Sequence, residues 1–260
     1  AGAVPGFMLA TLYIVYTVVW AKMRPDLVPV VKELDSDAGG LSRPEVVSGV
    51  GILILILIVL GGIWGGLFTP TEAGGVGAIG AMILGLVKGM KKRAFIYAVI
   101  DAGKTAAPIM ILLLTAALYA KFLAAAGISD LIQGTFSSFQ FGEFGIIMIM
   151  VIIWLILGMI LDSISIILLT VPIFAPVAEA LGFDPIAFGI FGILAIEAGL
   201  LTPPFGLLVY TVKGAVDDQS VKLSEIFAGS IPYWLLMLVV MGAIWVYPDV
   251  ALWLPRAALS

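Results

Sequence analysis

Gly199-Leu200-Leu201-Thr202-Pro203-Pro204-Phe205-Gly206 lies in the middle of an apolar run that extends from residue 185 to residue 212. The run exceeds the roughly 20 apolar residues that a membrane-spanning helix needs. A straight helix cannot continue here, because successive prolines remove amide donors and clash with the preceding turn, while the glycines permit unusual backbone angles. Carbonyls freed at membrane depth need an ion, water or another protein group. The stretch predicts a broken transmembrane helix over residues 185–213.

The composition around this stretch is that of a membrane protein. Hydrophobic residues make up 62% of the 260 residues and charged residues 12%, against about 45–50% and 25% in soluble domains. Mean hydropathy is +1.20. The sequence has no cysteine and no histidine, which excludes disulfides, the usual zinc and haem sites and a Ser-His-Asp relay. No nucleic-acid-binding pattern is present. We therefore expect an all-α integral membrane protein without a cofactor.

Apolar runs and loop charges predict the topology. Eleven of the 13 basic residues lie in three loop regions, which the positive-inside rule assigns to the cytoplasm, so residue 1 and the C-terminus are expected outside. Glycines are dense in 74–89, a spacing that allows close helix packing. The apolar runs cover residues 4–21, 47–67, 73–90, 105–126, 144–161, 165–181, 185–212 and 228–247, and the basic residues are Lys22, Arg24, Lys32, Arg43, Lys88, Lys91, Lys92, Arg93, Lys104, Lys213 and Lys222.

Two neighbouring runs, 144–161 and 165–181, meet at Asp162. Arms of about 15 helical residues would each reach about 22 Å, short of the roughly 30 Å hydrocarbon core. This favours a re-entrant hairpin over 143–181. Two complete membrane spans would leave the flanking loops on the same sides of the membrane, and they remain the alternative.

A helix broken beside a hairpin tip is the arrangement in which secondary transporters bind ions and anionic substrates. Sodium requires oxygen ligands. The candidates are the carbonyls near Gly158 and Gly199, the carbonyl and hydroxyl of Thr202, and the carbonyl of Phe205. The alternative is a proline kink whose carbonyls are satisfied by neighbouring helices.

Three acidic residues have a functional and a structural interpretation. Asp162 carries a penalty of about 2.5–3.5 kcal/mol in a bilayer, so it is expected to act on sodium indirectly, cap the second arm or hold the tip. Glu197 could relay protons, but a bond to amides freed by Pro203 and Pro204 is favoured. Glu72 suits the first turn of a helix from residue 73, with Thr71 as its cap. With the neighbouring Ser163 and Ser165, the tip and break residues Asp162, Pro203 and Pro204 form the expected substrate or tip region.

Four ordered stretches resemble the large membrane subunit of tripartite ATP-independent periplasmic (TRAP) transporters. Ile231-Pro232-Tyr233-Trp234 and Leu252-Trp253-Leu254-Pro255 also resemble the end of that family, so the likeness covers essentially the whole chain. The four stretches are Gly66-Leu67-Phe68-Thr69-Pro70-Thr71-Glu72-Ala73, Gly158-Met159-Ile160-Leu161-Asp162, Val171-Pro172-Ile173-Phe174-Ala175-Pro176-Val177-Ala178 and Gly199-Leu200-Leu201-Thr202-Pro203-Pro204-Phe205-Gly206.

The resemblance implies a sodium-driven importer of organic acids in the bacterial inner membrane, working by an elevator motion. A soluble periplasmic protein would deliver the substrate, and a small four-helix subunit would brace the large one within the lipid. The family fold implies two inverted repeats, each with a hairpin and a broken helix. When the family's ligand positions are transferred to the matching residues of this sequence, the resemblance implies one sodium site at Gly158, Gly199, Thr202 and Phe205.

The chain departs from the family in length, because its 260 residues hold one copy of the hairpin and break. We expect a single repeat, the C-terminal half, that needs an N-terminal half for transport. Rival interpretations are a sodium/dicarboxylate symporter without a binding protein and a non-transporting scaffold; an intramembrane enzyme lacks a recognisable nucleophile and base. The expected regions are 1–46 as first span and junction, 47–126 as scaffold helices, 127–214 with hairpin and broken helix, and 215–260 with the amphipathic linker and last span.

Overall fold

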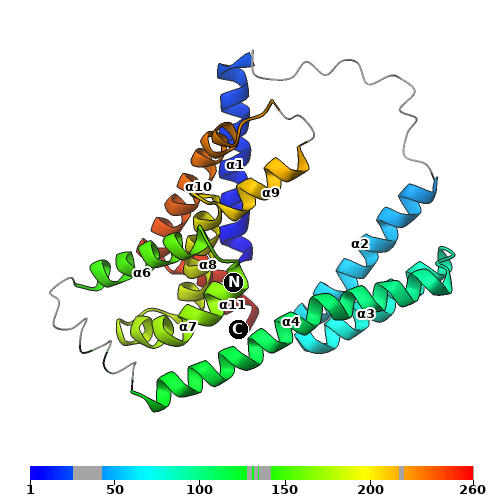
Figure 1. Ribbon diagram of the computed structural model, residues 1–260, viewed down its shortest axis with the longest axis horizontal. Coiled ribbons are helices and arrows are strands. Elements are labelled where there is room, and N and C mark those ends of the chain that lie inside the picture. The colour runs from blue at the N-terminus through cyan, green and yellow to red at the C-terminus, as the bar shows by residue number, and fades with distance from the viewer. Residues whose placement is uncertain (26–42, 128–130, 132–133, 135–141, 217–219, 260) are drawn as a thin grey trace. The chain divides into compact units, whose positions relative to one another are not determined.

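The computed structural model describes residues 1–25, 43–127, 131, 134, 142–216 and 220–259, and none of these residues forms a β-strand. The chain divides into two compact units, one formed by Ala1–Val28 with Ile111–Ser260 and the other by Pro29–Met110 (Figure 1). The helices are α1 (Ala3–Met23), α2 (Arg43–Trp64), α3 (Pro70–Val87), α4 (Lys92–Ala125), α6 (Gly142–Gly158), α7 (Ser163–Ala180), α8 (Pro185–Leu201), α9 (Leu207–Ala215), α10 (Leu223–Val246) and α11 (Asp249–Leu259).

Helix length and composition confirm a multi-pass membrane protein. Among the described residues, α1, α3, α4, α7 and α10 are long and apolar enough to cross a membrane. Shorter apolar helices occur at Ser48–Trp64, Gly142–Gly158 and Pro185–Leu201. The predicted all-α membrane class is therefore correct.

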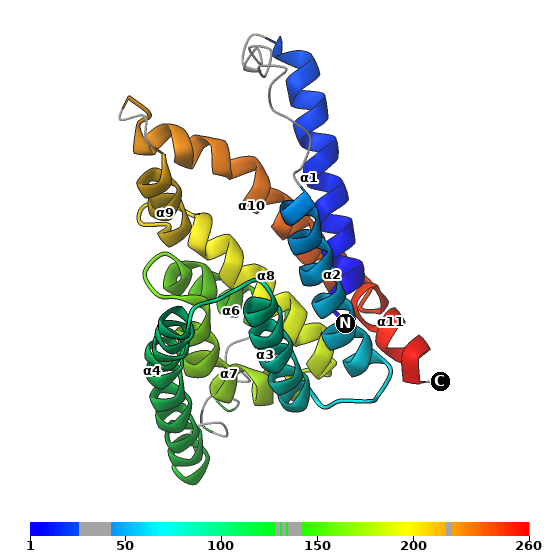
Figure 2. The same ribbon diagram turned by 90° about the vertical axis from the view of Figure 1, so that its right-hand side faces the viewer.

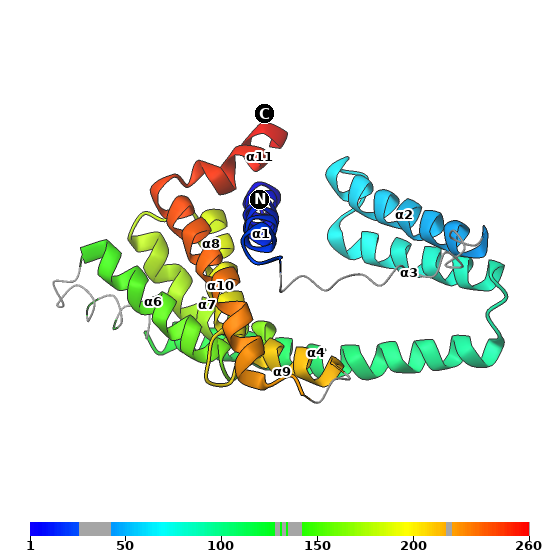
Figure 3. The same ribbon diagram turned by 90° about the horizontal axis from the view of Figure 1, so that it is seen from above.

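In the second unit, α2 and α3 lie side by side as an antiparallel pair joined by a short connection (Figure 3). Their contact uses glycines: a Cβ atom added to Gly80 would lie 2.3 Å from Leu55 Cδ2, and one added to Gly77 would lie 3.2 Å from Val59 Cγ2. Small residues let helix backbones approach closely. The predicted role of the glycine-dense segment in packing is confirmed for these two positions.

The start of α3 corrects one prediction. Thr69, and not Thr71, is the N-cap residue: its Oγ1 accepts a hydrogen bond from the Glu72 backbone amide at 3.3 Å, and Glu72 Oε2 accepts one from the Thr69 amide at 2.8 Å. Pro70 occupies the first helical position, where its missing N–H costs nothing. The helix therefore begins three residues earlier than predicted.

In the first unit, α6 and α7 form the two arms of the predicted hairpin. They contain 17 and 18 residues, or about 26 and 27 Å of helix, which is longer than the arms assumed from sequence. The buried Trp154 Nε1 of α6 donates a hydrogen bond to Thr170 Oγ1 of α7 at 2.9 Å. The arms are thus joined, while a re-entrant path through the bilayer stays a prediction.

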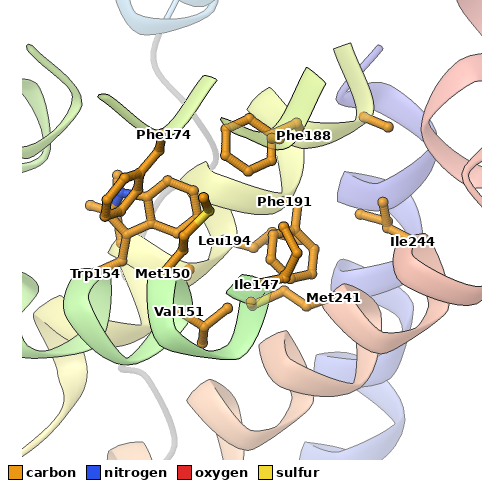
Figure 4. Packing of buried hydrophobic residues seen from close by; sticks show 14 of the residues in the cluster. Ile147, Met150, Val151, Trp154, Phe174, Phe188, Phe191, Leu194, Met241 and Ile244 are labelled. Carbon is orange, nitrogen blue, oxygen red and sulfur yellow. The ribbon is translucent and has the colours of Figure 1, made fainter. Parts of the chain in front are cut away.

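The core of this unit lies among α6, α7, α8 and α10 (Figure 4). Trp154 is at its centre, with ring centroids 5.2 Å from Phe174 and 5.5 Å from Phe188. A Cβ atom on Gly192 would lie 2.9 Å from the indole, so this glycine makes room for the tryptophan. The hairpin and α8 are therefore packed as one body.

Helices α1 and α10 also lie side by side (Figure 2). The Tyr13 hydroxyl donates to the Tyr233 carbonyl at 3.1 Å, and Thr17 Oγ1 lies 3.2 Å from the Tyr233 hydroxyl. α11 follows α10 and contacts the α1 region, so both chain ends lie at the same end of this unit. The side of the membrane on which they lie stays a prediction.

Two helices differ from the sequence prediction. α4 has 34 residues and begins at Lys92, whereas the apolar run begins at 105; Lys104, expected in a loop, lies inside the helix and pairs with Asp101 at 3.3 Å. α11 was not predicted. Both differences have one cause, since charged residues such as Asp101 in α4 and Arg256 in α11 interrupt the apolar runs there.

Candidate functional site

The predicted residues Gly158 and Gly199 lie against each other where α6 crosses α8. A Cβ atom on Gly158 would lie 2.7 Å from Gly199 Cα, and one on Gly199 would lie 3.0 Å from Gly158 Cα and 2.9 Å from the Leu155 carbonyl oxygen. These are backbone atoms that cannot move aside as a flexible side chain can. The crossing therefore requires glycine on both helices, and it brings the end of α6 beside the end of α8.

The predicted helix break is confirmed between α8 and α9. α8 ends at Leu201, and α9 begins after Gly206, which has a φ of 44° in the left-handed region. A Cβ atom on Gly206 would also lie 2.6 Å from the Phe227 ring. Conformation and space both favour glycine here, so the break is fixed at its second end.

Thr202 terminates α8 with two hydrogen bonds. Its backbone amide donates to the Gly199 carbonyl at 3.0 Å, and its Oγ1 donates to the Ala198 carbonyl at 2.7 Å. A hydroxyl that donates its hydrogen still has lone pairs to offer. Thr202 Oγ1 therefore keeps the capacity to accept a further contact.

Several carbonyl oxygens around the break have no hydrogen-bond donor within the described part of the chain. They include the predicted ligands Gly158, Thr202 and Phe205, whereas Gly199 already accepts from Thr202 and the Leu201 carbonyl accepts from Ser230 Oγ at 3.2 Å. Pro203 and Pro204 contribute no amide. The break thus leaves oxygen atoms for a cation, while the amides of Phe205, Gly206, Leu207 and Leu208 have no acceptor among the described residues and leave donors for an anion.

At the hairpin tip, Asp162 is the N-cap of α7. Its Oδ1 accepts a hydrogen bond from the Ser165 amide at 3.0 Å, and its Oδ2 accepts one from the Ser165 hydroxyl. The structure bears out the capping role among the three predicted for Asp162. A direct or indirect action on sodium stays a prediction.

Glu197 makes a contact that the sequence did not reveal. Ser163 Oγ donates to Glu197 Oε1 at 2.7 Å, so the expected bond from Glu197 to amides at the break is wrong. The partners are 34 positions apart and belong to no periodic pattern, so sequence spacing carries no signal for the pair. The contact joins the first residue of α7 to α8.

A cavity of about 360 Å³ lies between the tip and the break, lined by Met159, Ile160, Phe205, Leu207 and Tyr210. The first two residues follow Gly158 in the hairpin link, and the others flank Gly206. No lining residue is charged. Of the predicted site residues, Phe205, which is 57% exposed, lines this cavity.

The chain is similar to a family of membrane transport proteins over most of its length. Residues 1–250 match the family described as the DctM component of the tripartite ATP-independent periplasmic transporter. The chain is 30% identical over 258 residues to the C4-dicarboxylate TRAP transporter large permease protein DctM of Pseudomonas aeruginosa, covering 98% of this chain and 58% of the relative.

Two further relatives carry other names. The sialic acid TRAP transporter large permease protein SiaM of Vibrio cholerae is 29% identical over 80% of this chain and 48% of its own length. The ectoine/5-hydroxyectoine TRAP transporter large permease protein UehC of Ruegeria pomeroyi is 30% identical over 100% of this chain and 59% of its own length. The chain thus spans about half to three-fifths of the length of these relatives.

Proposed function

Because this chain belongs to the DctM-component family of tripartite ATP-independent periplasmic transporters, we propose that it takes part in sodium-coupled uptake of an organic acid across the inner membrane. The chain would act as one repeat of the large permease, and a second repeat would supply another hairpin and broken helix. Its coverage of 58% of a DctM relative is consistent with that division.

The observation that carries the sodium assignment is the crossing of Gly158 and Gly199 beside the break. The crossing brings the end of α6 within backbone contact of α8, next to carbonyls that lack donors among the described residues. Freed carbonyls and helix C-terminal ends coordinate sodium in transporters built on broken helices. The proposed ligands are oxygen atoms of Gly158, Gly199, Thr202 and Phe205.

The substrate would bind next to this cation site. The relatives' names cover a C4-dicarboxylate, sialic acid and ectoine, and the cavity between tip and break has no charged lining. A sodium ion bound beside it would supply the positive charge that a carboxylate needs. The bound sodium ion and the substrate carboxylate would attract each other, so each would favour the binding of the other and uptake would be coupled to sodium.

An elevator motion suits the packing of the hairpin against α8. The Trp154–Thr170 hydrogen bond joins the arms, and the core residues of α6, α7 and α8 interdigitate. A body packed in this way can move without internal rearrangement. By the family relation, a periplasmic binding protein would deliver the substrate and a small four-helix membrane subunit would brace the permease.

The test is uptake in proteoliposomes that contain the complete permease with this chain, its small subunit and loaded binding protein. Thr202→Ala removes one proposed ligand and is expected to raise the half-saturating sodium concentration about tenfold, whereas Thr202→Ser retains the hydroxyl and is the control. Asp162→Asn should have the smaller effect, because the amide oxygen still accepts from Ser165. Uptake that ignores sodium, or equal behaviour of both Thr202 variants, would contradict the site.

A further inference from the structure

The contact between Ser163 and Glu197 stands out because it is isolated. Within the described residues, it is the hydrogen bond that links the hairpin to α8; the other bonds at the tip, from Ser165 to Asp162, remain inside the first turn of α7. The 2.7 Å distance is that of a hydroxyl bonded to a carboxylate. One side chain on each element therefore fixes the start of α7 relative to α8.

Glu197 has no cation partner in the part of the chain that the structure describes. The ion pairs found there are Lys104–Asp101 and Arg256–Asp249, neither of which lies at the tip. The neighbours Ile196 and Ala198 are buried, which places the carboxylate at the edge of an apolar surface. Its orientation thus depends on the Ser163 hydroxyl.

The position of this contact relates it to the proposed ion ligands. Glu197 lies two residues before Gly199, and Ser163 lies five residues after Gly158, so the bond and the glycine crossing hold the link 159–162 from both ends. Release of the bond would leave the α7 end of the link held by helix packing alone, with no hydrogen bond to α8 among the described residues. Gly158 is the last residue of α6, so its carbonyl belongs to the peptide bond with which the link begins.

We propose that Glu197 is a positioning residue that holds the hairpin tip against α8 through Ser163 and thereby sets the sodium affinity of the site. The sodium ion in this inference rests on the proposed function, and the contact between Ser163 and Glu197 rests on the geometry. In this role the carboxylate acts as a hydrogen-bond acceptor. Glutamine can replace it in that role, since an amide oxygen also accepts from a hydroxyl.

The first measurement is sodium-dependent uptake by the assembled transporter. Ser163→Ala and Glu197→Ala should each raise the half-saturating sodium concentration about tenfold with little change in maximal rate, as expected for the loss of a hydrogen bond to a charged group. The double variant should be no worse than the more affected single variant. Glu197→Gln should stay within about twofold of wild type, and Glu179→Gln, at an exposed carboxylate of α7, is the matched control.

The second measurement is independent of transport. Amide hydrogen exchange of residues 159–165 in detergent without sodium should be faster in Ser163→Ala and Glu197→Ala, and unchanged in Glu197→Gln and Glu179→Gln. Unchanged exchange in the alanine variants overturns the positioning role. If Glu197→Gln loses sodium-dependent uptake while Ser163→Ala behaves as wild type, Glu197 acts in proton transfer. This result also overturns the positioning role. If wild-type uptake ignores sodium, the proposed function fails and the exchange data alone decide the contact.

Discussion

Gly158 and Gly199 determine how closely the hairpin approaches α8. Because a methyl group on Gly158 would meet backbone atoms of Gly199 at 2.7 Å, Gly158→Ala must separate the two helices. Overpacking of this kind costs about 1–3 kcal/mol. We expect a lower melting temperature in detergent and a loss of sodium response.

Gly189 provides the control for this prediction, because it also lies on α8 but a Cβ atom there would meet nothing within 4 Å. Gly189→Ala should leave the melting temperature unchanged or raise it slightly, since alanine has the higher helix propensity. Equal destabilisation by the two substitutions would show that helix propensity, and not close approach, determines the effect.

Single residues differ in how well their roles could be predicted from the sequence. Gly158 and Gly199 were predicted as candidate ligands from two interruptions in apolar runs, but their close contact was not predicted; the Asp162 cap was one of three roles proposed for an acid before a helix. The Ser163–Glu197 bond was missed because side-chain partners 34 residues apart leave no local pattern. The Thr71 prediction failed because proline at position 70 can begin a helix, which moves the cap to Thr69.

At the scale of elements, the hairpin arms are joined by one buried hydrogen bond. Trp154→Phe removes the donor to Thr170 Oγ1, while Thr170 still donates to the Ile166 carbonyl at 2.7 Å. A double-mutant cycle with Thr170→Val should give a coupling free energy of about 1 kcal/mol in the unfolding of the detergent-solubilised protein. A coupling near zero would mean that packing alone joins the arms.

The capping box of α3 gives a second prediction at this scale. Thr69→Ala and Glu72→Ala should each destabilise the start of α3 by about 1 kcal/mol, and their effects should not add, because each residue bonds the other's backbone amide. Amide exchange across residues 69–73 would measure this. Thr71→Ala is the control and should have no effect on exchange, since Thr71 has no capping bond.

The elements themselves were predicted where an apolar run coincides with a helix. The separation of α8 from α9 followed from Pro203 and Pro204, which no straight helix accommodates. The start of α4 and all of α11 were missed, because charged residues such as Asp101 and Arg256 interrupt the apolar runs there. Hydropathy therefore locates the uninterrupted apolar part of a helix and not its full length.

At the scale of the whole molecule, the proposed cation site implies that sodium stabilises the folded protein. A ligand that binds only the folded state at 100 times its dissociation constant adds about 2.7 kcal/mol. We expect the melting temperature of the assembled permease to rise with sodium and not with equal potassium. The rise should be smaller in Thr202→Ala, and a rise of the same size in both salts would indicate an ionic-strength effect instead.

The wider organisation of the protein follows from the family and not from local patterns. The order of helices and the membrane class could be predicted from the runs of residues, and the TRAP family from four motifs. The pairing of α1 with α10 through Tyr13, Thr17 and Tyr233 could not, because it joins the two ends of the sequence. Inverted repeats and the elevator motion stay predictions.

The length of α4 exceeds what one membrane crossing needs. Its 34 residues make about 51 Å of helix, whereas the apolar part from 105 to 125 covers about 31 Å, the thickness of the hydrocarbon core. The segment from Lys92 to Lys104 adds about 20 Å and carries four charged residues among apolar ones. Pro108 lies just inside the apolar part, and because a proline removes a backbone hydrogen bond within a helix, α4 has its weakest turn where the two parts meet.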